Sequence, residues 1–228
     1  MPNHVKNKLT VTGPETLVSE FIESVKGGWP ESDKTNHFDF KKIIAPPDEY
    51  ITGGCSHRHW DGHGPENCWY VWNRKNWGTK WNSYSFDGGW SEGESKAQGD
   101  PGMVRSYRAD PEASRVALIN SERRVGAIVS RTVVFETAWS TPMPVWERIA
   151  KDNPLLDFRI LYADEDYGRN LGALVGKEGA LRRSNLVSSR SILMETWGFD
   201  PDKKCEQCGG VFYYCEDECY GVEEEDGE

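Results

Sequence analysis

The chain has 228 residues, of which 37% are hydrophobic and 28% charged, and its formal net charge is −10. Its 10 Trp, 9 Tyr and 8 Phe residues supply enough apolar area for a proper core. No apolar run of 18 residues exists, and the first residues lack the apolar stretch of a signal peptide. We therefore expect a cytoplasmic protein that does not cross a membrane.

The negative charge is concentrated in one segment at the end of the sequence. Residues 216–228 hold eight acidic residues and no Lys or Arg, whereas the rest of the chain holds 29 acidic and 27 basic residues. This nearly neutral body lacks the basic footprint of a typical nucleic-acid-binding domain. We interpret the acidic segment as a solvated one, with partner binding or nucleic-acid mimicry as the alternatives.

The first 46 residues predict a β-α-β unit. Apolar and polar residues alternate over residues 4–13, which predicts a half-buried strand. An apolar stripe from Leu17 to Val25 follows Gly13-Pro14 and predicts a helix. A second strand is expected over residues 37–44, just before a pair of prolines.

A second β-α-β unit follows about 130 residues later. Residues 131–139, RTVVFETAW, predict the strongest strand of the sequence, with Val133, Phe135 and Trp139 on one face. An amphipathic helix is expected from Pro142, then a strand over residues 156–162 and a hairpin that turns at residues 177–179. Two such units predict an α+β fold, a ferredoxin-like split β-α-β sandwich with both helices on one face of an antiparallel sheet.

Two segments are added to this domain. Residues 47–130 separate the two units and form a Trp-rich insertion that is too long for a bare loop. The composition changes again near the end, where residues 201–228 predict a small Cys-rich module with an acidic end. The predicted organisation is therefore one domain over residues 1–200, including the insertion, followed by this module.

The segment WYVWNRKNWGTKWN, residues 69–82, places four tryptophans around one glycine. The helical spacing of Trp69 and Trp72 predicts a helix that ends at Gly78, where a positive φ is needed. A strand is expected to follow over residues 80–86. In this interpretation the tryptophans belong to the core and pack the insertion against the sheet.

An aromatic platform for a base, a sugar or a cation is the alternative interpretation of the same segment. Three polar side chains would then read the ligand. Nucleic acid is not the favoured partner, because no segment resembles the aromatic motif of classical RNA-binding strands. The predicted binding residues are Trp69, Trp72, Asn73, Trp77, Lys80, Trp81 and Asn82, of which Asn73, Lys80 and Asn82 are the polar readers.

Three segments resemble the Api92/YubB-like ferredoxin-like family of phage and plasmid proteins. They are MPNHVKNKLTVTG at the start, WNRKNWGTKWN in the middle, and FETAWSTPMPVWERIAKDNPLLDF followed by LYADEDYG. The resemblance covers roughly residues 1–46, 69–86 and 131–175. It implies a ferredoxin-like domain and a mobile-element origin, but no settled biochemical activity. Two cysteine-containing segments depart from the family's usual form, so their contribution is not implied by the resemblance.

The first of these departures predicts a zinc site. Four cysteines lie within fifteen residues: Cys205, Cys208, Cys215 and Cys219. Two pairs of thiolates suit a closed, tetrahedral structural Zn²⁺ site, which has no open position for catalysis. The six-residue gap between the pairs is shorter than in common zinc ribbons. Two disulfides, a redox pair or an unligated segment are the alternatives, and disulfides are rare in a reducing cytoplasm.

The second departure is a weaker metal-binding pattern in GGCSHRHWDGHGPENC. Cys55, His57 and His59 alternate onto one side of an extended chain, and His63 lies nearby. Imidazole and thiolate ligands suit zinc or iron. A solvated, Gly-rich loop without a metal is the alternative. A run of acids at residues 164–166 is interpreted in the same way, as a polar turn in preference to a divalent-cation site.

These observations favour a non-catalytic accessory protein of a phage or plasmid. It would dock an unidentified host or phage protein and carry a structural zinc. No hydrolase, phosphate-loop, dinucleotide or zinc-protease motif is present. A metal-dependent enzyme that acts on nucleic acid through the His/Cys loop is the first alternative, and a nucleic-acid-binding module is the second.

Overall fold

The computed structural model describes residues 3–29, 32–49, 68–93, 127–166 and 168–206. Its main sheet has six antiparallel strands in the order β4-β5-β1-β6-β7-β8, and a separate hairpin joins β2 to β3. The strands are β1 (His4–Pro14), β2 (Gly27–Trp29), β3 (Ser32–Asn36), β4 (Ser91–Glu92), β5 (Ile128–Ala138), β6 (Asp157–Asp164), β7 (Gly172–Lys177) and β8 (Ala180–Arg183).

The first strand lies at the centre of the sheet. It pairs with β5 from His4 to Pro14 and with β6 on its other side, both antiparallel. Its alternating pattern buries Val5, Leu9 and Val11 completely. The strands predicted over residues 4–13, 131–139 and 156–162 are thereby confirmed.

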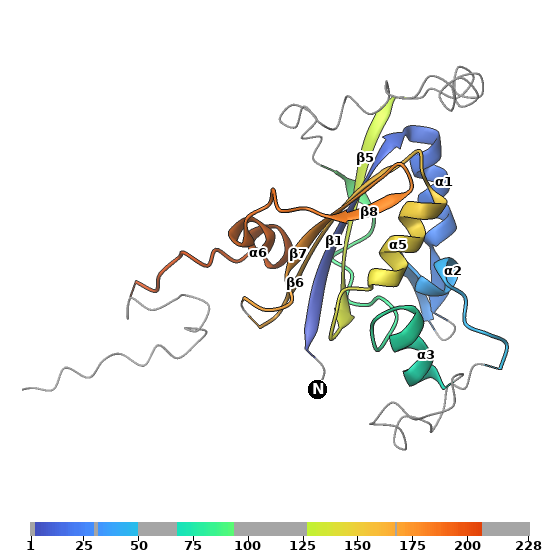
Figure 1. Ribbon diagram of the computed structural model, residues 1–228, viewed down its shortest axis with the longest axis horizontal. Coiled ribbons are helices and arrows are strands. Elements are labelled where there is room, and N and C mark those ends of the chain that lie inside the picture. The colour runs from blue at the N-terminus through green and yellow to red at the C-terminus, as the bar shows by residue number, and fades with distance from the viewer. Residues whose placement is uncertain (1–2, 30–31, 50–67, 94–126, 167, 207–228) are drawn as a thin grey trace, which may run out of the picture.

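Two amphipathic helices cover one face of this sheet. They are α1 (Glu15–Val25) and α5 (Met143–Asp152), and Figure 1 shows both on the same side of the strands. Their apolar stripes, including Phe21 and Trp146, enter one core cluster with the inward residues of β1, β5 and β6. The elements β1, α1, β4, β5, α5 and β6 follow one another in the β-α-β-β-α-β order of the predicted split β-α-β sandwich, with β4 as a short strand at the edge of the sheet.

A buried polar network fixes the second unit to the central strand. The Asn7 side chain donates to Thr137 Oγ1 at 2.9 Å and accepts from Thr141 Oγ1 at 2.7 Å. Thr141 Oγ1 in turn accepts from Trp146 Nε1 at 2.7 Å. These hydrogen bonds join β1, β5 and α5, and they satisfy the polar groups that the core encloses.

The strand expected over residues 37–44 is wrong. The chain forms a short helix there, α2 (Phe40–Ile43), with Asp39 as its N-cap accepting from the Lys41 amide at 3.0 Å. Phe38 and Phe40 are both fully buried, so their spacing imitates that of a strand. Asp39 between them favours the helix start, because its carboxylate satisfies an amide that has no partner within the helix.

The edge of the sheet beside β5 is instead occupied by the insertion. Tyr84 forms an isolated bridge with Glu136, and β4 pairs with β5 further along. The continuous strand expected over residues 80–86 is therefore reduced to this bridge. A positive φ angle of 47° at Ser85 interrupts the extended backbone within this range.

A further helix, which the sequence did not predict, covers the opposite face of the sheet. It is α6 (Ser189–Trp197), and Figure 1 shows it on the other side from α1 and α5. Ile192 and Leu193 pack against Leu161 and Ala173 in a second, smaller apolar cluster. The hairpin expected before it is confirmed, because β7 pairs with β8 around a tight turn. Among the described elements, no helix has the length and apolarity needed to cross a membrane.

Candidate functional site

The Trp-rich segment forms helix α3 (Trp69–Asn76) and the loop after it. The helix ends as predicted, because Gly78 has a φ of 79° and its amide donates to the Asn73 carbonyl at 3.1 Å. A β-carbon at Gly78 would lie 2.9 Å from Pro144 Cδ. Glycine is therefore needed both for the backbone conformation and for the close contact with the start of α5.

Hydrogen bonds fasten the loop after Gly78 to the end of β5. Thr79 Oγ1 donates to the Ala138 carbonyl at 2.6 Å, and Ser140 Oγ donates to the Gly78 carbonyl. The Asn73 side chain donates to the Lys80 carbonyl at 2.9 Å. The backbone of Lys80 is thus held between α3 and the sheet.

The four tryptophans of the segment occupy different environments. Trp77 lies in the core with 1% of its surface exposed, and its Nε1 donates to the Ile44 carbonyl at 3.0 Å. Trp72 packs edge-on against Trp77, with ring centroids 5.3 Å apart. Trp69 belongs to a small cluster around Cys68, whereas Trp81 is 37% exposed. The prediction that these tryptophans belong to the core therefore holds for Trp77 and Trp72, but not for Trp81.

Two of the three polar side chains that were predicted to contact a ligand form hydrogen bonds within the fold instead. Asn73 is buried and holds the loop through the bond to Lys80. Asn82 Oδ1 accepts from the Phe40 amide at 2.9 Å, and its Nδ2 donates to Asp39 Oδ1 at 2.7 Å. Both side chains therefore have internal partners, and Lys80 is the one whose charged group reaches the surface rings.

An aromatic and cationic surface forms where α3, the loop and the end of β5 meet. Lys80 Nζ lies 4.5 Å from the ring centroid of Trp81 and 4.9 Å from that of Trp139. Arg74 Cζ lies 5.8 Å from the Trp139 ring and 5.4 Å from the Tyr70 ring. These distances are typical of cation–π contacts. We call this group of five residues, Tyr70, Arg74, Lys80, Trp81 and Trp139, the tryptophan surface.

Trp139 does not lie on the buried face of β5 as predicted. Its backbone has a φ of 76°, which breaks the strand alternation and leaves the side chain 37% exposed. The conformation is held at both ends: its amide donates to the Asn3 carbonyl at 2.8 Å, and its carbonyl accepts from Asn170 Nδ2 at 3.0 Å. Backbone strain of this kind at an exposed aromatic residue is typical of functional sites.

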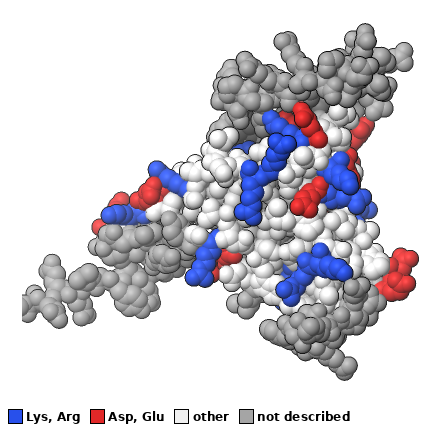
Figure 2. Space-filling view, viewed as in Figure 1, with Lys and Arg blue, Asp and Glu red and all other residues white. Residues whose placement is uncertain are grey.

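The two cations of the tryptophan surface form no ion pair with any residue that the structure describes. The Tyr84 ring packs edge-on against the Trp81 ring, with the two ring centroids 6.0 Å apart. Burial raises the pKa of Tyr84, and the nearby Glu136 and Glu165 raise it further. On the face shown in Figure 2, basic and acidic side chains are interspersed and form no continuous field of one sign.

The acidic run at the end of β6 forms a polar turn. Asp164 accepts from the Asp166 amide at 3.0 Å, and Glu165 accepts from the His4 amide at 2.9 Å. Asn3 Nδ2 donates to Asp166 at 2.8 Å. The carboxylates are thus oriented by the protein's own donors, which fits the polar-turn interpretation.

Most of the predicted metal ligands lie outside the described residues. This applies to Cys208, Cys215 and Cys219 of the zinc prediction, and to Cys55, His57, His59 and His63 of the second cluster. Cys205 is described and its side chain is buried. Within the described part of the chain, no three metal-binding side chains converge. Cys68, which precedes α3, is buried and disulfide-bonded.

Three members of the tryptophan surface were missed from the sequence. Tyr70 and Arg74 are four residues apart on α3, a spacing that places them on one side of a helix. That signal was available, but the regularly spaced tryptophans concealed it. Trp139 carried no local signal, since its conformation depends on Asn3 and Asn170, which are distant in sequence.

Comparison with known proteins agrees with this fold. Residues 118–200 match the family model described as the ferredoxin-like domain in Api92-like protein. No curated protein and no solved structure matches the chain. The matched range contains β5, α5, β6, β7, β8 and α6. The second half of the sandwich is therefore similar to the ferredoxin-like domain in Api92-like protein, as the sequence resemblance implied.

Proposed function

We propose that the protein is an accessory protein of a phage or plasmid that binds a host or phage protein through the tryptophan surface. The supporting observation is that Trp81 and Trp139 are each 37% exposed beside Lys80 and Arg74. Trp, Tyr and Arg are the residue types that contribute most to protein–protein affinity. The mobile-element origin rests on the family resemblance.

The surface is also arranged to bind with little loss of entropy. Hydrogen bonds fix the backbone on both sides of Trp139 and hold the loop that carries Lys80. Side chains that are ordered before binding lose less conformational freedom when a partner docks. Large rings on a fixed frame thus favour a docking function over a loosely solvated loop.

The test is to identify the partner by photo-crosslinking from position 81 in host lysate and then to measure its affinity. Trp81→Ala and Trp139→Ala should each weaken binding by about 2 kcal/mol, or roughly 30-fold, because each removes a ring near the centre of the interface. Leu155→Ala is the matched control, since Leu155 is 54% exposed outside this surface. Unchanged affinity in both tryptophan variants would contradict the proposal.

Single-stranded nucleic acid is the second candidate ligand. Exposed aromatic rings beside cations also form a stacking platform for bases, and Lys80 and Arg74 have no acidic partner within the described parts of the chain. The acids Glu136 and Glu165 near Tyr84 disfavour a phosphate backbone on that side. A fluorescence titration with an oligonucleotide separates the candidates: salt-sensitive quenching that Lys80→Ala reduces would favour nucleic acid over a protein partner.

A structural zinc is the second part of the proposal, with Cys205, Cys208, Cys215 and Cys219 as its ligands. It is supported by their spacing and by the burial of Cys205. Metal analysis of the purified protein should find one zinc per chain, which Cys205→Ser removes. A second metal lost in His57→Ala would favour the metal-dependent enzyme, and protein without any metal would contradict both metal sites.

A further inference from the structure

A cleft of about 560 Å³ opens beside β7 and β8, away from the tryptophan surface. Its lining combines three basic side chains, those of Arg159, Lys177 and Arg182, with one carboxylate, that of Glu178, and with apolar side chains. The apolar part includes Val175 on β7 and Leu186 and Val187 in the segment that leads into α6. Leu186 is 89% exposed and adds a large apolar side chain to this lining.

The basic residues are aligned by the register of the sheet. Arg159 on β6 lies opposite Val175, and Val175 lies opposite Arg182 on β8. Directly paired residues project from the same face of a sheet, so these three side chains form one row. Lys177 follows Val175 by two residues and therefore projects from the same face.

The basic residues of this row differ in the ion pairs and hydrogen bonds that they form. Both Arg159 nitrogens donate to Glu195, at 2.9 and 2.8 Å, and Lys177 Nζ lies 3.8 Å from Asp157. Arg182, in contrast, makes no ion pair or side-chain hydrogen bond with any part of the chain that the structure describes, and it is exposed. The lining thus carries three basic residues against the single carboxylate of Glu178, and Arg182 is the basic residue without an ion pair among the described residues. Together with the apolar lining, this suits an acidic segment that also carries apolar side chains.

We propose that the chain's own acidic segment, residues 216–228, occupies this cleft. The segment provides eight carboxylates without a basic residue, together with Tyr220 and Val222 for the apolar lining. It begins ten residues after the last described residue, Glu206, a length that spans up to about 35 Å when extended. Attachment to the same chain raises its effective concentration to about the millimolar range, so weak contacts suffice to keep the cleft occupied.

The experiment uses the full chain and a labelled peptide of residues 220–228. In one variant the four acids 223–226 are replaced by Gln or Asn, which should release the segment and leave the cysteines unchanged. The peptide is expected to bind this variant at least about tenfold more tightly than it binds the parent chain, because the parent's cleft is occupied. Binding should weaken as salt increases, since charges carry part of it.

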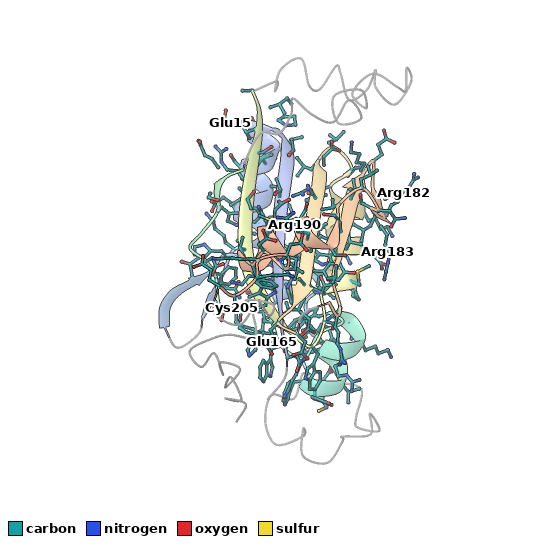
Figure 3. The ribbon with its side chains drawn as sticks, turned by 90° about the vertical axis from the view of Figure 1, so that its left-hand side faces the viewer. Glu15, Glu165, Arg182, Arg183, Arg190 and Cys205 are labelled. Atoms are coloured by element: carbon teal, nitrogen blue, oxygen red, sulfur yellow. The ribbon has the colours of Figure 1, made fainter. Side chains whose placement is uncertain are left out.

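Two neighbouring arginines supply the matched control. Arg182 and Arg183 are adjacent on β8, at the same side of the molecule in Figure 3, but strand alternation directs them to opposite faces. In the charge-neutralised background, Arg182→Gln should reduce peptide affinity about tenfold and Arg183→Gln should leave it unchanged. Circular dichroism checks that each variant is folded.

Three results would overturn the proposal. The first is equal peptide binding, or none, in the parent and the charge-neutralised chain. The second is an equal loss of affinity in Arg182→Gln and Arg183→Gln, which would indicate a nonspecific charge effect. The third is an oligonucleotide that binds the parent through Arg182 while the peptide does not compete, which would assign the cleft to phosphate groups of nucleic acid.

Discussion

Glu195 is the residue through which α6 is anchored electrostatically to the sheet. It accepts two hydrogen bonds from Arg159 and one from Lys8 at 3.1 Å. Burial acts to raise the pKa of Glu195, but the bonds and charges of Arg159 and Lys8 outweigh it and lower the pKa to about 2. One carboxylate thus serves two cations on neighbouring strands, and its charged form is the one that the folded state favours.

This pKa predicts an acid-dependent loss of stability. Because the folded pKa is below the ordinary value of 4.5, the contribution of Glu195 is present above pH 4.5 and is lost as the pH falls toward 2. Glu195→Gln should therefore reduce the free energy of unfolding at pH 7 by about 1–3 kcal/mol. In urea titrations the difference in the free energy of unfolding between the variant and the parent should become smaller as the pH is lowered toward 3. Glu23→Gln, at an exposed pair with Lys26, should show no such gap.

Single residues also show where sequence reading succeeds and where it fails. Gly78 was placed correctly because glycine is itself the signal for a left-handed helix end. Trp139 was placed on the wrong side, because strand alternation predicts a buried ring and nothing nearby indicates the positive φ. Asn73 and Asn82 looked available for a ligand, but their tertiary partners, Lys80 and Asp39, could not be inferred from spacing.

Among the elements, those with a complete apolar stripe were predictable. The buried residues of α1 and α5 recur at helical spacing, and those of β1 alternate strictly. In contrast, α6 buries only Ile192, Leu193 and Thr196, too weak a pattern to identify. The edge strand β4 has two residues and is defined by its partner β5, so no local pattern could reveal it.

The joint between α3 and the sheet allows a prediction about its glycine. Gly78→Ala should lower the free energy of unfolding by about 2–3 kcal/mol, because it adds a contact with Pro144 to the cost of a positive φ. Gly88→Ala isolates the backbone cost: Gly88 also has a φ of 79°, but nothing lies within 4 Å of its added carbon. Gly88→Ala should lower the free energy of unfolding by only about 1 kcal/mol. Equal losses in urea unfolding would mean that α5 moves to accommodate the new methyl group.

At the scale of the whole molecule, the two apolar clusters lie on opposite faces of one sheet. The larger cluster lies under α1 and α5, and the smaller one lies under α6. The last residue that contributes to either cluster is Phe199. The described residues after it, 200–206, lie outside both clusters, although Cys205 is buried. Both clusters are thus formed by described residues that precede the cysteine segment.

This arrangement predicts how the molecule responds to metal removal. A chelator should take the proposed zinc from the cysteine segment and leave the main thermal transition within about 2 °C of its original midpoint, because the apolar clusters stay intact. The midpoint is measured by thermal unfolding followed by circular dichroism, before and after addition of EDTA, with Cys205→Ser for comparison. A fall of 10 °C or more would show that the cysteine segment supports the sandwich.

The central position of β1 also has a consequence for synthesis on the ribosome. Val5 pairs with Thr137 and with Asp164, so neither side of the first strand has its partner until about 130 more residues have been made. At roughly 5–20 residues per second, this delay lasts on the order of 6–30 s. During that time β1 exposes two unpaired edges and an apolar face, which makes it a target for chaperones. The sandwich can therefore close only after β5 and β6 have been synthesised, when the first strand pairs with both of them.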